Sequence, residues 1–134
     1  MRARALQQLW LFEPRGNFTA VPVDDRTRDT VDVIVLAVAG HFGASIHDVR
    51  STTRRQPIAT VRQIAMYVAR KVTGHGPVAI AGVLKRDHST IVYGIQTVES
   101  ALAFDPFLRR NVMLCLEKAT AAVAQLAQAA TSTT

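Results

Sequence analysis

Apolar residues recur along this chain every three or four positions, and polar residues fill the positions between them. This pattern is typical of amphipathic helices that turn one face toward a shared core. We therefore expect an all-α bundle of about six helices that ends in a long C-terminal helix. The three clearest apolar stripes are Val61, Ala65, Val68 and Val72; Ile91, Ile95, Val98 and Leu102; and Leu108, Val112, Cys115 and Ala119.

Polar residues indicate where these helices begin. Asp87 is an N-cap candidate, and Ser45 precedes a short helical pattern. Asp105 opens an alanine-rich helix that reaches about Ala130. Residues 60–63, Thr-Val-Arg-Gln, have the form of a capping box, so we predict that a helix begins there.

Residues 74–77, Gly-His-Gly-Pro, interrupt the helical pattern. A short apolar piece follows over residues 78–84, and a tight Lys-Arg turn then leads into the Asp87 helix. This order of elements predicts a helix-turn-helix arrangement.

Residues 30–40, Thr-Val-Asp-Val-Ile-Val-Leu-Ala-Val-Ala-Gly, allow two interpretations. The β-branched side chains favour a strand, whereas a Thr30 cap and Gly40 near the end favour a buried helix. Because no neighbouring run supplies a partner strand, we predict a helix from Thr30. The run is too short to span a bilayer. We assign residues 30–130 to the helical domain and residues 1–29, which contain Pro14 and Gly16, to a flexible arm.

Positive charge is concentrated in one part of the chain. The 134 residues carry 16 Lys+Arg against 10 Asp+Glu, for a formal net charge of +6. Residues 50–86 contain eight of these cations and no carboxylate. A segregated field of one sign indicates a polyanionic partner, either nucleic acid or an anionic membrane surface.

The basic segment includes a loop, residues 51–57, that has no apolar residue to hold it in place. Arg54 and Arg55 could therefore enter a DNA groove, although two solvated arginines would give the same pattern. Arg62 is expected in the first turn of the next helix, where a cation opposes the helix dipole unless a phosphate is near.

The start of the Asp87 helix carries side chains suited to base edges. Ser89 and Thr90 are short enough to reach a base, Asp87 can accept from a cytosine amino group, and Arg86 can bind guanine or a phosphate. Lys85 adds a second cation to the turn. A well-capped surface helix without DNA contacts fits the same residues equally well.

Other kinds of chemistry lack support in the sequence. The four histidines lie on different expected elements without ligand spacing, so we expect no metal and no cofactor. No nucleophile is paired with a base, so we expect no enzyme. Cys115 belongs to an apolar stripe, and a lone cysteine fits a reducing cytoplasm. We also expect no nucleotide-binding loop, because no Gly-x-x-x-x-Gly-Lys-Ser/Thr run occurs.

Residues 8–12, Gln-Leu-Trp-Leu-Phe, resemble the pentapeptide by which bacterial proteins bind the replication sliding clamp. The resemblance implies a glutamine amide in a polar notch and apolar anchors in a pocket. Trp10 departs from the small or acidic residue that is usual at the middle position. The same segment could instead pack its apolar side chains on the domain. The candidate clamp-binding residues are Gln8, Leu9, Leu11 and Phe12.

Two segments carry a resemblance to a known family. Residues 61–73, Val-Arg-Gln-Ile-Ala-Met-Tyr-Val-Ala-Arg-Lys-Val-Thr, and 80–92, Ile-Ala-Gly-Val-Leu-Lys-Arg-Asp-His-Ser-Thr-Ile-Val, resemble the C-terminal DNA-binding domain of the bacterial replication initiator DnaA. The resemblance covers about residues 30–120 and implies a Trp-repressor-like helical bundle. It also implies roles for site residues: Arg54 in the minor groove, Arg62 and Gln63 at phosphates and near bases, and Arg86, Asp87, His88, Ser89 and Thr90 in the major groove.

Three departures from the family pattern bear on affinity. Val61 replaces a helix-opening proline, and Lys85 stands where two glycines usually shorten the turn. Gln96 and Thr97 replace basic residues further along the same helix.

From these observations we expect a stand-alone, cytoplasmic, nucleoid-associated protein that binds double-stranded DNA at initiator-type boxes and regulates bacterial replication initiation. The sliding clamp and a DnaA-related regulator are further expected partners, and no membrane partner is expected. Two alternatives stay open. One is a helix-turn-helix transcription regulator with its own operator, and the other is a protein-interaction module that has lost DNA binding.

Overall fold

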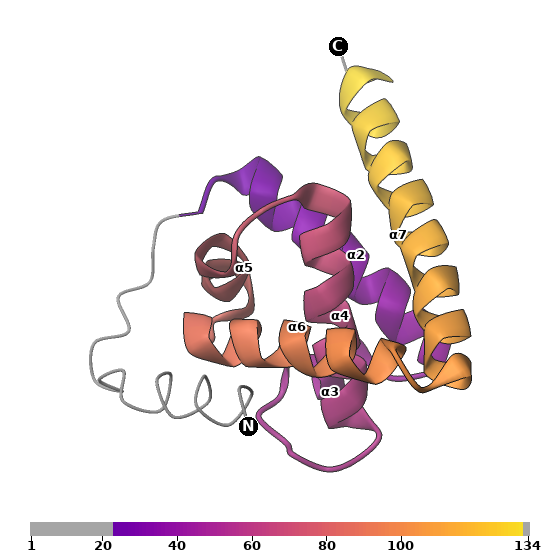
Figure 1. Ribbon diagram of the computed structural model, residues 1–134. Helices are drawn as coiled ribbons and strands as arrows, with labels where there is room; N and C mark the ends of the chain where they lie inside the picture. Colours follow the sequence, from indigo (N-terminus) through magenta and orange to yellow (C-terminus); the bar gives the residue numbers. More distant parts are fainter. Residues whose placement is uncertain (1–22, 133–134) are drawn as a thin grey trace.

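Six helices and no strand make up residues 23–132, the part of the chain that the computed structural model describes (Figure 1). The expected all-α fold is confirmed. The candidate clamp peptide, residues 8–12, lies outside the described residues. The helices are α2 (Asp25–Phe42), α3 (Ile46–Arg50), α4 (Ile58–Thr73), α5 (Pro77–Leu84), α6 (His88–Leu102) and α7 (Pro106–Ser132).

Helix α4 is the centre of the bundle. It packs against α2, α6 and α7, and also touches α3 and α5. Every residue from Ile64 to Ala69 is buried, so this helix has core contacts on nearly all sides there. The αL residue Gly74 ends the helix, with φ of 73° and a backbone N–H that donates to the Arg70 carbonyl at 2.9 Å.

Helix α2 confirms the helical interpretation of residues 30–40 but begins five residues before the predicted start. The N-cap is Asp24, whose Oδ1 accepts from the Thr27 backbone N–H at 2.8 Å. Thr30 lies inside the helix and donates its hydroxyl to the Arg26 carbonyl. The prediction of a Thr30 cap was wrong because the first two turns are polar and carry no apolar stripe. The buried positions are Val31, Ile34, Val35, Val38 and Ala39.

Helix α4 also begins earlier than its capping-box pattern indicated. The first helical residue is Ile58, and Pro57 occupies the N-cap position after a cis Gln56–Pro57 bond. The Gln56 side-chain oxygen accepts from both the Thr60 backbone N–H, at 3.2 Å, and the Thr60 hydroxyl, at 2.7 Å. The prediction that Thr60 caps α4 was therefore wrong. Consequently Arg62 lies in the second turn, not the first.

Helices α5 and α6 form the expected helix-turn-helix. The Asp87 side chain caps α6 by accepting from the Ser89 backbone N–H at 3.3 Å, which confirms the predicted cap. Helix α6 crosses α4 in Figure 1, and the two helices approach closely at Gly94. A Cβ at Gly94 would lie 2.6 Å from the Met66 sulfur, so α6 needs a residue without a side chain there.

Helix α7 covers the opposite side of the bundle from α5. The Asp105 carboxylate accepts from the Leu108 backbone N–H at 3.0 Å, as expected for a helix that opens at Asp105-Pro106. Val112, Cys115 and Ala119 are buried against the core. Burial raises the pKa of the Cys115 thiol to about 11, so the thiol stays protonated at neutral pH. The far end of α7 projects past the other helices (Figure 1).

None of the six helices combines the length and the hydropathy that crossing a lipid bilayer requires.

Candidate nucleic-acid interface

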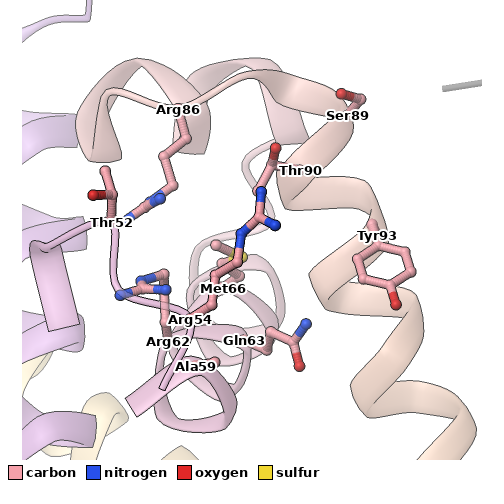
Figure 2. Close-up of a pocket in the computed structure, with 10 residues that line it drawn as sticks. All are labelled: Thr52, Arg54, Ala59, Arg62, Gln63, Met66, Arg86, Ser89, Thr90 and Tyr93. Carbon is pink, nitrogen blue, oxygen red and sulfur yellow. The ribbon is translucent and has the colours of Figure 1, made fainter. Parts of the chain in front are cut away.

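A cleft of about 780 Å³ lies between the basic loop (residues 51–57), the start of α4 and the start of α6 (Figure 2). It brings together segments that are more than thirty positions apart in the sequence. The helix-turn-helix positions one wall, since the Asp87 cap fixes where α6 begins. The lining residues are Thr52, Arg54, Ala59, Arg62, Gln63, Met66, Arg86, Ser89, Thr90 and Tyr93.

Six of the ten predicted DNA-contacting residues line this cleft. These six are Arg54, Arg62, Gln63, Arg86, Ser89 and Thr90. The other four predicted residues, Arg55, Lys85, Asp87 and His88, do not line the cleft. Of these, Asp87 and His88 are neighbours at the cap of α6, with 3.4 Å between Asp87 Oδ1 and His88 Nδ1.

Sequence reasoning missed four lining residues, namely Thr52, Ala59, Met66 and Tyr93. A helical-spacing argument could have identified Tyr93, which lies one turn after Ser89 on the same face of α6. Tyr93 is 41% exposed. Met66 could not have been identified in this way, because its apolar side chain belongs to the core pattern.

Arg54 is the lining cation without a bonded partner among the described residues. Its side chain is exposed and extends from the loop toward the start of α6 (Figure 2). Arg55 is also exposed, while its backbone N–H donates to the Thr53 hydroxyl at 3.2 Å. The guanidinium of Arg54 is therefore available to a ligand that enters the cleft.

The Arg62 side chain, unlike that of Arg54, is held in place by hydrogen bonds. This side chain is buried, and each guanidinium nitrogen donates to a backbone carbonyl. Nε donates to Val49 at 2.7 Å, Nη1 to Thr53 at 2.9 Å and Nη2 to Asp48 at 3.4 Å. None of the ion pairs in residues 23–132 involves Arg62. The buried positive charge is therefore stabilised by hydrogen bonds to backbone carbonyls and not by a carboxylate.

Arg86 reaches the same loop from the other side of the cleft. Its Nη2 donates to the Arg50 carbonyl at 3.3 Å and to the Ser51 carbonyl. In Figure 2 the side chain points from the α5–α6 turn toward Thr52. The loop lacks an apolar anchor, as expected, but polar contacts from two arginines hold its first half.

Arg62 and Arg86 bring two positive charges to the lining of the cleft. Burial lowers the pKa of the Arg62 guanidinium, and the charge of Arg86 lowers it further. Burial also lowers the pKa of Arg86. Both shifts have the sign expected for cations that lack a carboxylate partner, so an anion in the cleft would be favoured. Within residues 23–132, no three His, Cys, Asp or Glu side chains are placed to hold a metal ion.

Comparisons with known proteins agree with this geometry. The family model described as the bacterial dnaA protein helix-turn-helix matches residues 31–98. The chain is 34% identical over 96 residues to the chromosomal replication initiator protein DnaA of Lachnoclostridium phytofermentans, which covers 71% of this chain and 21% of that protein. It is 35% identical over 86 residues to DnaA 2 of Chlamydia pneumoniae, covering 64% and 19%.

A solved structure described as a DNA replication initiation factor has the same fold, with a TM-score of 0.67 and 29% sequence identity. The match covers 73% of this chain and 30% of that chain. The chain thus spans about a fifth of the length of the curated relatives it matches.

Proposed function

Because this chain belongs to the bacterial dnaA protein helix-turn-helix family, we propose that it binds double-stranded DNA at initiator-type boxes. The observation that carries the proposal is the pairing of a partner-free Arg54 on the loop with Ser89 and Thr90 at the start of α6, across one electropositive cleft. A helix start in the major groove and an arginine in the adjacent minor groove can bind one face of a duplex together.

The charge distribution supports the same proposal. Phosphate contacts supply most of the affinity of such proteins and base contacts supply the specificity. Residues 50–86 provide the cations without any carboxylate, and the start of α6 provides short polar side chains. We assign affinity to the loop and turn cations, and sequence preference to α6.

The experiment that tests this function is a salt titration on two duplexes, one that carries an initiator box and one with the same bases scrambled. We expect affinity for both to fall steeply with salt, because released counterions dominate binding. We also expect tighter binding to the box at every salt concentration.

Each other outcome identifies a different function. Steep salt dependence without box preference would favour a transcription regulator with its own operator. No measurable binding to either duplex would favour a protein-interaction module that has lost DNA binding.

A finer proposal concerns regulation. We propose that the protein regulates replication initiation on nucleoid DNA in the cytoplasm, and that residues 8–12 bind the sliding clamp. The support is the resemblance of Gln-Leu-Trp-Leu-Phe to clamp-binding peptides. A chain that joins such a peptide to an initiator-type DNA-binding domain could modulate the clamp-dependent inactivation of the initiator by a DnaA-related regulator.

A further inference from the structure

We infer that Arg62 and Arg86 are positioning residues that clasp the backbone of the basic loop and thereby present Arg54 to DNA. The inference rests on the proposed DNA binding and refines it. In place of three arginines that each contact the duplex, it assigns one arginine to contact and two to holding the contacting one in place.

Both arginines contact the short helix α3. A helix leaves its last four carbonyls without partners inside the helix, and five residues give α3 little stability of its own. Arg62 and Arg86 supply donors for three of these carbonyls, those of Asp48, Val49 and Arg50. The Asp48 carbonyl also accepts from the Ser51 backbone N–H and hydroxyl. Two cations at a helix C-terminus also complement its dipole.

Both arginines also contact the basic loop. Beyond α3, Arg86 donates to the Ser51 carbonyl and Arg62 to the Thr53 carbonyl, at 2.9 Å in the latter case. These two acceptors belong to residues three positions and one position before Arg54. Backbone to which a buried guanidinium is bonded cannot swing freely, so the direction of the Arg54 side chain is limited before any DNA arrives.

The contacts of Arg62 depend on the shape of its guanidinium. Arg62 uses three different nitrogens for three carbonyls, and it does so with a side chain that is 8% exposed. A lysine has one nitrogen and cannot reproduce this planar fork, although it keeps the charge. A phosphate contact, in contrast, tolerates lysine as a point charge. Arg62→Lys therefore separates the two roles.

The first measurement uses the free protein. We expect Arg62→Lys to speed backbone hydrogen exchange at Thr53 and Arg55 by about tenfold or more, and to leave the amides of α6 protected. Arg86→Lys should have the same effect in a second variant. The matched control is Arg70→Lys, since Arg70 also donates to two carbonyls, of Gly74 and His75, but far from the loop. Unchanged loop exchange in both lysine variants would overturn the inference.

The second measurement uses the initiator-box duplex and a double-mutant cycle. If Arg62 acts through the loop, Arg62→Lys lowers the affinity for the box duplex in the parent protein. In an Arg54→Ala background the same substitution should lower the affinity further by less than about twofold. Two independent contacts would instead give additive losses, which would contradict the inference. If Arg54→Ala alone leaves affinity unchanged, the proposed role of Arg54 fails. The exchange measurement still decides whether Arg62 and Arg86 hold the backbone of the basic loop in place.

Discussion

At the scale of single residues, Lys85 combines an unfavourable backbone conformation with a useful charge. It ends α5 at φ 56° and ψ 50°, in the left-handed region that disfavours a side chain. We expect Lys85→Gly to raise the free energy of unfolding by about 0.5–1 kcal/mol, because relief of the strain exceeds the entropy cost of glycine. Urea unfolding measures this change.

The control for Lys85 is Lys85→Ala, which removes the charge but keeps a side chain at positive φ. It should not gain stability. Both variants should bind DNA more weakly and to the same extent, since both lose one cation near the cleft. Equal stability of the glycine and alanine variants would contradict the argument from strain.

The residues proposed to contact base edges give a second prediction. Thr90 is exposed and lines the cleft, and His88 lies beside it at the start of α6. We expect Thr90→Ala or His88→Ala to weaken box binding by about 1–3 kcal/mol and to reduce the preference for box over scrambled DNA. Ser100→Ala, about two turns along α6 from Tyr93, the last cleft residue on this helix, is the matched control. Retained preference in both the Thr90 and the His88 variant would indicate that these residues serve only the helix start.

Some site residues could be predicted from sequence and others could not. Asp87 caps α6 as its residue type and position indicated, because capping is a local interaction. The role of Arg62 was different: its acceptors at Val49 and Asp48 lie more than ten positions away, and they are carbonyls that every residue carries. No pattern of side chains could point to them.

At the scale of helices, apolar periodicity predicted the elements well and their starts less well. The stripes of α4, α6 and α7 face the core as expected, with Val72, Leu102 and Leu108 partly buried and the other positions buried, because packing of an apolar face decides whether a helix forms. The starts of α2 and α4 depended on Asp24 and Gln56, which precede any apolar pattern. A cap can be recognised from the sequence when the apolar pattern of its helix begins in the first turn after the cap.

The contact between α4 and α6 gives a prediction about packing. Gly94 is buried, and an added methyl group would meet the Met66 sulfur, which is itself buried. We expect Gly94→Ala to lower the free energy of unfolding by about 1 kcal/mol, since overpacking outweighs the gain in helix propensity. The measurement is again urea unfolding.

Two variants test the cause. Gly40→Ala on α2 is the matched control, because no atom lies within 4 Å of a Cβ there, and it should stabilise the protein by up to about 1 kcal/mol. In a Met66→Ala background, Gly94→Ala should also become stabilising. If it remains unfavourable there, the Met66 contact is not the reason that glycine is needed.

At the scale of the whole molecule, the sequence indicated a basic surface but not a cleft. The acid-free segment over residues 50–86 indicated that the cations of this part of the chain share one surface region. Which of them face one another was set by the packing of α3 and α6 on α4, which brings Arg86 to the carbonyls of Arg50 and Ser51. Contacts of this separation depend on the tertiary fold.

The last prediction concerns residues 8–12 and the relation of this segment to the domain. A peptide that binds the sliding clamp must offer Leu11 and Phe12 to a partner's pocket, so the same side chains cannot also fill the core of the domain. A few anchors that offset the cost of ordering a short segment should give roughly micromolar affinity. We expect Leu11→Ala with Phe12→Ala to abolish binding to purified clamp and to leave helicity, melting temperature and box binding unchanged.

The competing account predicts the opposite pair of results. If residues 8–12 pack on the domain, the double variant loses buried apolar area, and its melting temperature falls by several degrees. The parent protein would then show no clamp binding. Gln8→Ala provides an independent check, because it removes the amide proposed for the polar notch and leaves both apolar anchors in place. Under the clamp account it weakens clamp binding without a change in melting temperature, since only the partner contacts that amide.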